Sequence, residues 1–548
     1  MRSFLLVLIF ALSFCTVALP QHANHDTKKD VKEQSAAFIP GMGSHHHSVS
    51  TPNAEAQKFF DQGLSLVFAF NHEEAIRSFK RAAELDPQLA MAYWGVALAL
   101  GPNINLDVDP EREKAAYEAV QKALSLATGA SESERAYIEA LVKRYSIHPQ
   151  ADLKKLAVDY KNAMGDLVKR YPDDLDAATL YAESAMNLRP WKFWTADGKP
   201  AEGTEEIVAT LESVLRRDPN HIGAIHYYIH AVEASFNPER ALPYAPKLPS
   251  LIPAAGHLVH MPAHIYARTG DYEAAALSNK DAARVDETYM KAHGAGGLYP
   301  TMYYSHNLHF LAIAESMSGR FAEARTAAQQ LEAYVGPHVK AMPMLEGFMT
   351  VSPLLLVRFN RWDDIEKLAA PDKIMMGTTA VWHFARGMAF EAKGRSKDAA
   401  AELDAMIAVQ KQVPADASFG LNSANYVLQI AQKVLAARLA RRSDSKQAIA
   451  FLRGAVELED SLAYDEPQAW FLPVREALGA ALMRNGDYRG AEQVFRTDLE
   501  KNRRNGRSLF GLMEALKAQK KNHEALLVKK QFDAAWENAD TKLSLSLF

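Results

Sequence analysis

The chain has 548 residues, 48% of them hydrophobic and 9% aromatic, with 62 basic against 66 acidic residues and a net charge of −4. This length exceeds one ordinary hydrophobic core, so it predicts several domains or an array of repeats. Because the composition has no basic excess, it argues against nucleic acid and anionic membrane surfaces as partners.

The first residues have the features of an export signal. Arg2 precedes an apolar run from Phe4 to Phe14 that is too short to span a bilayer as a stable helix. Ala18 then ends a stretch of small residues suited to signal peptidase. The sequence predicts a signal peptide over 1–18, a periplasmic or secreted mature chain, and no membrane span after cleavage. Cys15 is the single cysteine, so the mature chain would have no thiol for disulfides or metal ligands.

Residues 19–52 form a polar segment that contains His45, His46 and His47. We interpret it as an extended leader. Its three consecutive histidines are open to two interpretations, an accessory metal ligand or a flexible tail.

From residue 53 onward the apolar residues follow a helical period, and the alternation typical of strands is absent. A frame of 34 residues recurs, with small residues at positions 8, 20 and 27. It is clearest in three copies, which begin at Ala56, Ala380 and Leu472 and have glycine at position 8. The chain therefore resembles the tetratricopeptide repeat (TPR) family, as a secreted bacterial-type member with a histidine-rich middle section.

The resemblance implies an all-α fold, a right-handed TPR-like α-solenoid of antiparallel helix pairs in which each pair packs on its neighbours. We divide it into N-terminal repeats at 53–200, central histidine-rich repeats at 201–340 and C-terminal repeats at 341–548. In TPR proteins the first helix of each pair lines the concave groove, and positions 2, 5, 9 and 12 point into it. An insertion interrupts the central repeats, and we interpret its glycine-rich stretch from His293 to Gly297 as flexible.

The central repeats place histidines at these groove positions. Frames that begin at Ile222, Gly256 and Ser305 put seven histidines and one glutamate there, namely His226, His230, Glu233, His257, His260, His264, His306 and His309. The first repeat has Gln57 and Phe60 at positions 2 and 5, so the cluster is local. Pro262 interrupts the middle helix, where we expect a kink.

Imidazoles that lie together need partners for both ring nitrogens, and a bound cation satisfies several at once. We therefore predict that these eight residues hold metal at one centre, mononuclear or dinuclear. Imidazole suits copper, zinc and iron, of which copper is favoured. Metal is expected to be lost as the pH falls below about 6. A polar or aromatic ligand groove and a purely structural network are the alternatives.

The sequence leaves several classes of function open. The first is an exported metalloprotein with a small-molecule or peptide ligand in its groove. Whether it is an enzyme is undecided; if it is, an oxidoreductase is favoured over a hydrolase, with histidine ligands and Glu233 as a ligand or proton acceptor. The others are an adaptor that binds a peptide or a partner protein, and a periplasmic metal storage or delivery protein. No H-E-x-x-H, G-x-S-x-G or P-loop motif occurs in the sequence.

Overall fold

A computed structural model describes residues 36–293 and 297–548. The predicted signal peptide, the first part of the leader (19–35) and residues 294–296 of the glycine-rich insertion lie outside these ranges. The described residues belong to one compact unit. Among the described residues, no helix combines the length and apolarity that crossing a membrane requires.

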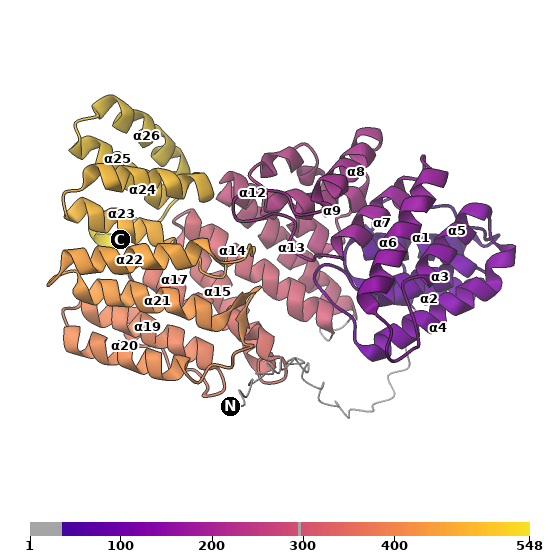
Figure 1. Cartoon of the computed structure of the whole chain (residues 1–548), viewed down its shortest axis with the longest axis horizontal. Helices are drawn as coiled ribbons and strands as arrows, with labels where there is room; N and C mark the ends of the chain where they lie inside the picture. Colours follow the sequence, from indigo (N-terminus) through magenta and orange to yellow (C-terminus); the bar gives the residue numbers. More distant parts are fainter. Residues whose placement is uncertain (1–35, 294–296) are drawn as a thin grey trace, which may run out of the picture. The chain divides into compact units, whose positions relative to one another are not determined.

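Helices account for nearly all regular structure in the described part of the chain (Figure 1). The N-terminal helices are α1 (Ala54–Phe68), α2 (His72–Leu85), α3 (Ala90–Leu100), α4 (Pro110–Leu126), α5 (Glu132–Val142), α6 (Leu153–Arg170) and α7 (Leu175–Met186). The central helices are α8 (Thr204–Arg217), α9 (Ile222–Glu233), α10 (Leu248–Leu251), α11 (Gly256–His260), α12 (Pro262–Thr269), α13 (Tyr272–His293), α14 (Ser305–Met317) and α15 (Phe321–Val335).

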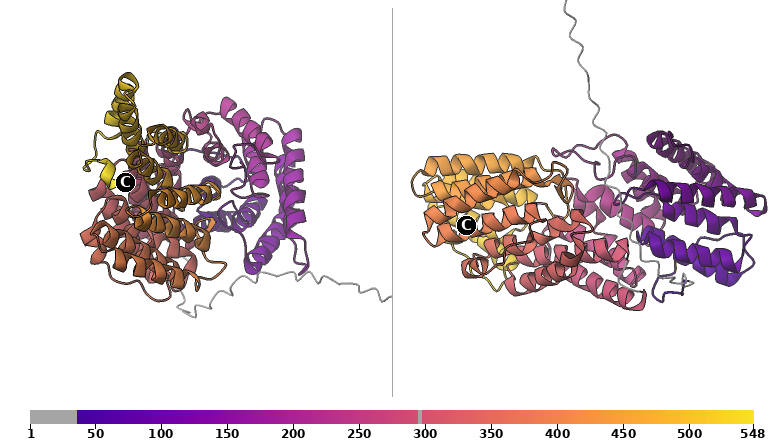
Figure 2. Two further views of the ribbon diagram at one scale, coloured as in Figure 1. Left: turned by 60° about the vertical axis from the view of Figure 1, so that its left-hand side comes forward. Right: turned by 90° about the horizontal axis from the view of Figure 1, so that it is seen from below.

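The C-terminal helices are α16 (Glu346–Met349), α17 (Val351–Arg358), α18 (Trp362–Glu366), α19 (Met376–Ala392), α20 (Ser396–Gln410), α21 (Ala424–Ala440), α22 (Ser445–Asp460), α23 (Val474–Arg484), α24 (Tyr488–Lys501), α25 (Gly506–Ala518) and α26 (Asn522–Ala535). A short hairpin of two strands with two residues each, β1 (Ser418–Phe419) and β2 (Asn422–Ser423), separates α20 from α21. Each helix packs on the next in sequence, and Figure 2 shows the orange C-terminal helices side by side. The predicted all-α, TPR-like solenoid of helix pairs is confirmed.

The repeat frame has a direct steric cause. The ring of Phe79 lies between Gly63 and Gly95, so closely that a Cβ atom at either glycine would come within 2.7 Å or 2.4 Å of it. Phe495 occupies the same place between Gly479 and Gly511, where the corresponding distances are 2.4 Å and 2.3 Å. In these two copies an aromatic ring needs a glycine both in its own repeat and in the next, which explains Gly63 and Gly479 at position 8; in the third copy the Leu435 side chain lies against Gly387 instead.

The described part of the leader, 36–52, is extended and packs on the first repeats. The backbone N–H of Ile39 donates to Oε1 of Gln62 at 2.8 Å, and that of Ser50 donates to Oε1 of Glu134 at 2.6 Å. Asp176 lies 2.8 Å from Nδ1 of His47 and 3.0 Å from Nε2 of His45. The flexible-tail interpretation is therefore wrong for this part of the leader, because main-chain and side-chain bonds attach it to α1, α5 and α7.

The central repeats depart from regular helix pairs where the histidines lie. The middle helix is divided into α11 and α12 at Met261, because Pro262 has no N–H to continue the hydrogen-bond ladder. A π-helical turn, Pro300–Tyr304, leads into α14. The second helix of the repeat that begins at Gly256, α13, packs on α11, α12 and α14, so one long helix supports three of the four helices that contain the predicted ligands.

Candidate metal centre

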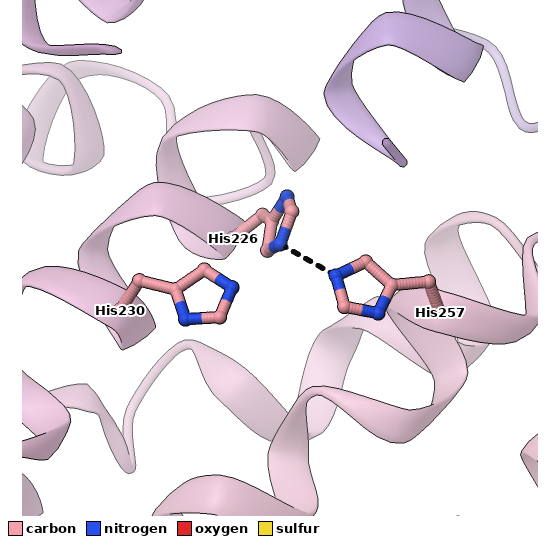
Figure 3. A group of neighbouring side chains, drawn as sticks. All are labelled: His226, His230 and His257. Atoms are coloured by element: carbon pink, nitrogen blue, oxygen red, sulfur yellow. Dashed lines mark hydrogen bonds between the residues drawn. The ribbon is translucent and has the colours of Figure 1, made fainter. Parts of the chain in front are cut away.

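Three histidines from α9 and α11 form the first triad: His226, His230 and His257. One ring nitrogen from each lies within 4.8 Å of the other two. Figure 3 shows the three rings facing one another, with a contact of 3.0 Å between Nε2 of His226 and Nε2 of His257. All three residues are at most 2% exposed, so water cannot satisfy their ring nitrogens.

The outer nitrogens of the first triad determine which atoms face inward. Nδ1 of His226 donates to the carbonyl oxygen of Phe68 at 2.6 Å, a carbonyl left free at the end of α1. Nδ1 of His230 donates to Oε1 of Glu233 at 2.7 Å. Because these oxygens only accept, each Nε2 presents a lone pair. Nε2 of His230 is buried and has no hydrogen-bond partner.

The second triad consists of His260 at the end of α11, His264 on α12 and His306 on α14. Nε2 of His260 lies 2.7 Å from Nε2 of His264 and 3.1 Å from Nε2 of His306. The break at Met261 therefore does not separate His260 from His264; their ring centroids are 4.7 Å apart and the ring planes nearly perpendicular.

The second triad has the same arrangement of outer partners as the first. Nδ1 of His260 donates to Oδ1 of Asn279 at 2.7 Å, and the amide of Asn279 is oriented by its own donation to the carbonyl of Ala275. Nδ1 of His264 donates to Oε2 of Glu233 at 2.6 Å. Two lone pairs therefore face each other at 2.7 Å, which is unfavourable unless a proton or a metal ion lies between them.

Glu233 connects the two triads. Its two carboxylate oxygens accept from His230 of the first triad and His264 of the second, and the residue is fully buried. The rings of His257 and His260 stack with their centroids 5.8 Å apart, and those of His230 and His264 are 5.5 Å apart. The six imidazoles therefore form two adjacent sites with a shared carboxylate behind them.

Burial lowers the pKa of most imidazoles at the site, whereas the pKa of His264 is raised because Glu233 outweighs its burial. Burial lowers the pKa of His226, His257, His260 and His306 well below the ordinary value, and the neighbouring imidazoles add to this effect. These four rings are therefore neutral at pH 7, the form that binds metal. Glu233 behaves oppositely: burial alone would raise its pKa, but His264 and His230 hold that pKa below its usual range.

The structure places two of the eight predicted residues outside both triads. Glu233 bonds the outer nitrogens of His230 and His264, the position of a residue that orients ligands and fixes their tautomers. His309 lies one turn beyond His306, with its ring against Phe348 at 5.3 Å between centroids, and burial lowers its pKa to about 4. The other six histidines come together as two groups of three.

Several residues at the site have no sign in the repeat frame. Tyr464 lies between α22 and α23, and its hydroxyl is 3.0 Å from Oε2 of Glu233 and 2.6 Å from Oε2 of Glu466. Asn279, on the second helix of its repeat rather than at a groove position, and the carbonyl of Phe68 orient imidazoles from other elements. No periodic pattern selects such residues, because their partners are up to 231 positions away in the sequence.

A cavity of about 380 Å³ opens in front of both triads, and His230, His257, His264 and His306 contribute to its wall. The remainder of the wall includes aromatic residues from the N-terminal, central and C-terminal repeats. Tyr303 is one of these, with its ring centroid 4.6 Å from that of His257. The imidazoles therefore face a space large enough for a small molecule.

No protein-family model matches the chain, and a search of curated proteins finds no relative. Solved structures are similar along most of its length. The human IFIT1 dimer with PPP-AAAA matches 88% of this chain and 91% of its own, at 12% identity and a TM-score of 0.31. The yeast Tom70 matches 87% and 98% at 13% identity and a TM-score of 0.32. The P58(IPK) TPR domain matches 86% and 100% at 12% identity and a TM-score of 0.22. At these scores, the matches carry no inference about ligands or activity.

Proposed function

We propose that this chain is a metalloprotein in which each histidine triad holds one metal ion. The observation that carries the proposal is the contact of 2.7 Å between Nε2 of His260 and Nε2 of His264, whose Nδ1 atoms are both already committed to acceptors. A single proton would satisfy these two nitrogens only. A metal ion would in addition bind the ring nitrogen of His306, and a second metal ion would bind the ring nitrogens of the first triad.

The distances fit shared coordination. Two nitrogens bound to one ion at about 2.0–2.1 Å lie about 2.8–3.4 Å apart for angles between about 90° and 110°. The Nε2 to Nε2 distances of 2.7, 3.0 and 3.1 Å are close to this range. Three imidazoles per ion leave a coordination position open, as in catalytic rather than structural sites. Copper is favoured, and zinc and iron are the alternatives.

We further propose that the loaded protein is an oxidoreductase that acts on a small molecule in the cavity. A bound redox metal would supply the electron transfer. The residues of this chain would exclude water from the buried imidazoles, hold each ligand in one tautomer through Glu233, Asn279 and Phe68, and place the substrate against the triads. We also keep the signal peptide as a proposal: an exported chain would be periplasmic or secreted, where metal storage or delivery would be the non-catalytic role.

Dioxygen uptake tests the catalytic part of this proposal. The metal-free chain is loaded anaerobically with two equivalents of Cu⁺ and then exposed to dioxygen in an oxygen-electrode cell. We expect one dioxygen to be consumed per chain, because two one-electron donors together supply two electrons. Retention of both ions without uptake would favour storage or delivery and contradict the oxidoreductase.

Peptide binding by the C-terminal repeats is the second candidate function. The segment 541–548, which includes a 3-10 turn at Leu545–Leu547, lies against these repeats, and its backbone carbonyls accept hydrogen bonds from their side chains. Nδ2 of Asn360 and Nη2 of Arg507 both donate to the carbonyl of Leu547 at 3.0 Å, and Nη1 of Arg438 donates to that of Phe548 at 3.3 Å. Recognition of main-chain carbonyls in this way would suit a peptide ligand.

A further inference from the structure

The cavity in front of the triads is built for a particular class of ligand. Its volume of about 380 Å³ is more than twice the roughly 150 Å³ of a cavity that holds benzene in a protein core. It therefore has room for a molecule of two or three rings. Two features of the wall, its aromatic rings and its charge, restrict what that molecule can be.

Two aromatic residues of the wall are held in a backbone conformation that bulky residues rarely adopt. Phe70 and Trp191 have φ angles of 57° and 62°, in the left-handed region. The ring of Phe70 contacts those of His226 and His257, with ring centroids 4.5 Å and 5.6 Å apart. The ring of Trp191 contacts that of His230, with ring centroids 5.2 Å apart. Glycine would occupy such positions without strain. Aromatic rings here therefore suggest a functional requirement at the triads.

Another part of the wall comes from two loops of the C-terminal repeats that are attached to each other. The hairpin residue Leu421 donates its N–H to Oδ2 of Asp465 at 2.7 Å, and Nδ2 of Asn422 donates to the carbonyl of Ala463 at 3.1 Å. Gly420 has a φ of 59° and lies against the Asp465 carboxylate, so a side chain has no room there. Phe419 and Phe471 are both 4% exposed and contribute their rings to the cavity.

The charged groups of the wall disfavour an anion. Of the described residues that line the cavity, one, Arg112, is a lysine or arginine, and it donates to the carbonyls of Leu100 and Ala99. Glu73, Asp465 and Glu466 contribute carboxyl groups. Burial raises the pKa of Asp465 and of Glu466 to about 7, so both carboxyl groups are partly ionised at neutral pH and would repel an anionic ligand.

We propose that this cavity binds an uncharged aromatic molecule of two or three rings, which contacts the aromatic side chains of its wall, among them Phe70, Trp191 and Phe471. Its role as substrate rests on the proposed function. The binding itself does not, because the aromatic walls exist without metal. Edge-to-face and stacked ring contacts provide the selectivity for aromatic over aliphatic ligands.

Calorimetric titration of the metal-free full chain tests the proposal with two probes that share a ring system. These are 2-naphthalenemethanol, which is uncharged, and 2-naphthoate, which is an anion, both at pH 7.5. We expect 1:1 binding of the alcohol and at least tenfold weaker binding of the carboxylate. Trp191→Gly should weaken alcohol binding at least tenfold, because it removes a ring while glycine accepts the positive φ. Phe236→Gly removes an aromatic ring that is 58% exposed and is the matched control.

Each outcome has one meaning. Failure of both probes to bind, equal affinity for the carboxylate, or equal effects of Trp191→Gly and Phe236→Gly would overturn the aromatic-ligand proposal. A chain that binds the alcohol but retains no metal would support this proposal and contradict the proposed function. A chain that holds two metal ions but does not bind the alcohol would contradict the aromatic-ligand proposal and support the proposed function.

Discussion

Replacing His260 and His264 together by alanine is expected to reduce the metal bound by this chain from two ions to one. These residues supply two of the three nitrogens of the second triad, and one remaining imidazole on His306 cannot hold an ion in competition with a chelator. The first triad shares no imidazole with the second, so its ion should remain. Equilibrium dialysis followed by elemental analysis measures both numbers.

A control with equal histidine loss separates this effect from a general one. His148 and His523 are both exposed, and the variant His148→Ala/His523→Ala should keep two ions. Helical circular dichroism should be the same for wild type and both variants, because His260 and His264 are buried but make no backbone hydrogen bonds through their side chains. If the His260/His264 variant still binds two ions, these residues are not ligands.

The second large effect is expected at Glu233, which we place behind the ligands. Glu233→Gln leaves one accepting oxygen where the carboxylate has two, so either His230 or His264 faces an NH₂ group instead. That imidazole must then put its proton on Nε2, which removes it as a ligand. Changes to such supporting residues typically weaken metal binding by roughly 10- to 100-fold, and we expect a loss of this size in a competitive chelator titration.

Glu212 provides the control for this substitution. It accepts hydrogen bonds from the Tyr228 hydroxyl of α9 and from Arg240, so it contacts the same helix as His226 and His230 on the side away from the triads. Glu212→Gln should change metal affinity less than twofold. Similar affinities for Glu233→Gln and Glu212→Gln would mean that Glu233 does not orient the imidazoles.

Much of the fold could be predicted from the sequence, because close packing between the helices of the repeats requires glycine at fixed positions. Gly63 and Gly479 recur at position 8 since a phenylalanine ring occupies the place of a side chain there. The same frame put histidines of neighbouring helices at equivalent inward positions. In the structure six of the seven come together. Whether they bind metal stays a prediction.

The remainder depends on contacts that no local pattern describes. The division into two triads arises within α11, where His257 contacts His226 of α9 while His260, three residues later, contacts His306 of α14. The roles of Asn279 and Tyr464 depend on the second helix of a central repeat and on a loop of the C-terminal repeats. His309 satisfied the same positional rule as His306 but points at Phe348, because successive inward positions on one helix reach different neighbours.

The most direct test of the account is the metal content of the native protein, purified from its own compartment without chelators or added metal. Inductively coupled plasma mass spectrometry, referenced to protein concentration from amino-acid analysis, should find two transition-metal ions per chain, with copper as the favoured metal. A native protein with no stoichiometric metal, whose metal-free form also binds none on titration with copper, zinc and iron, would contradict the proposal that the histidine triads are metal sites.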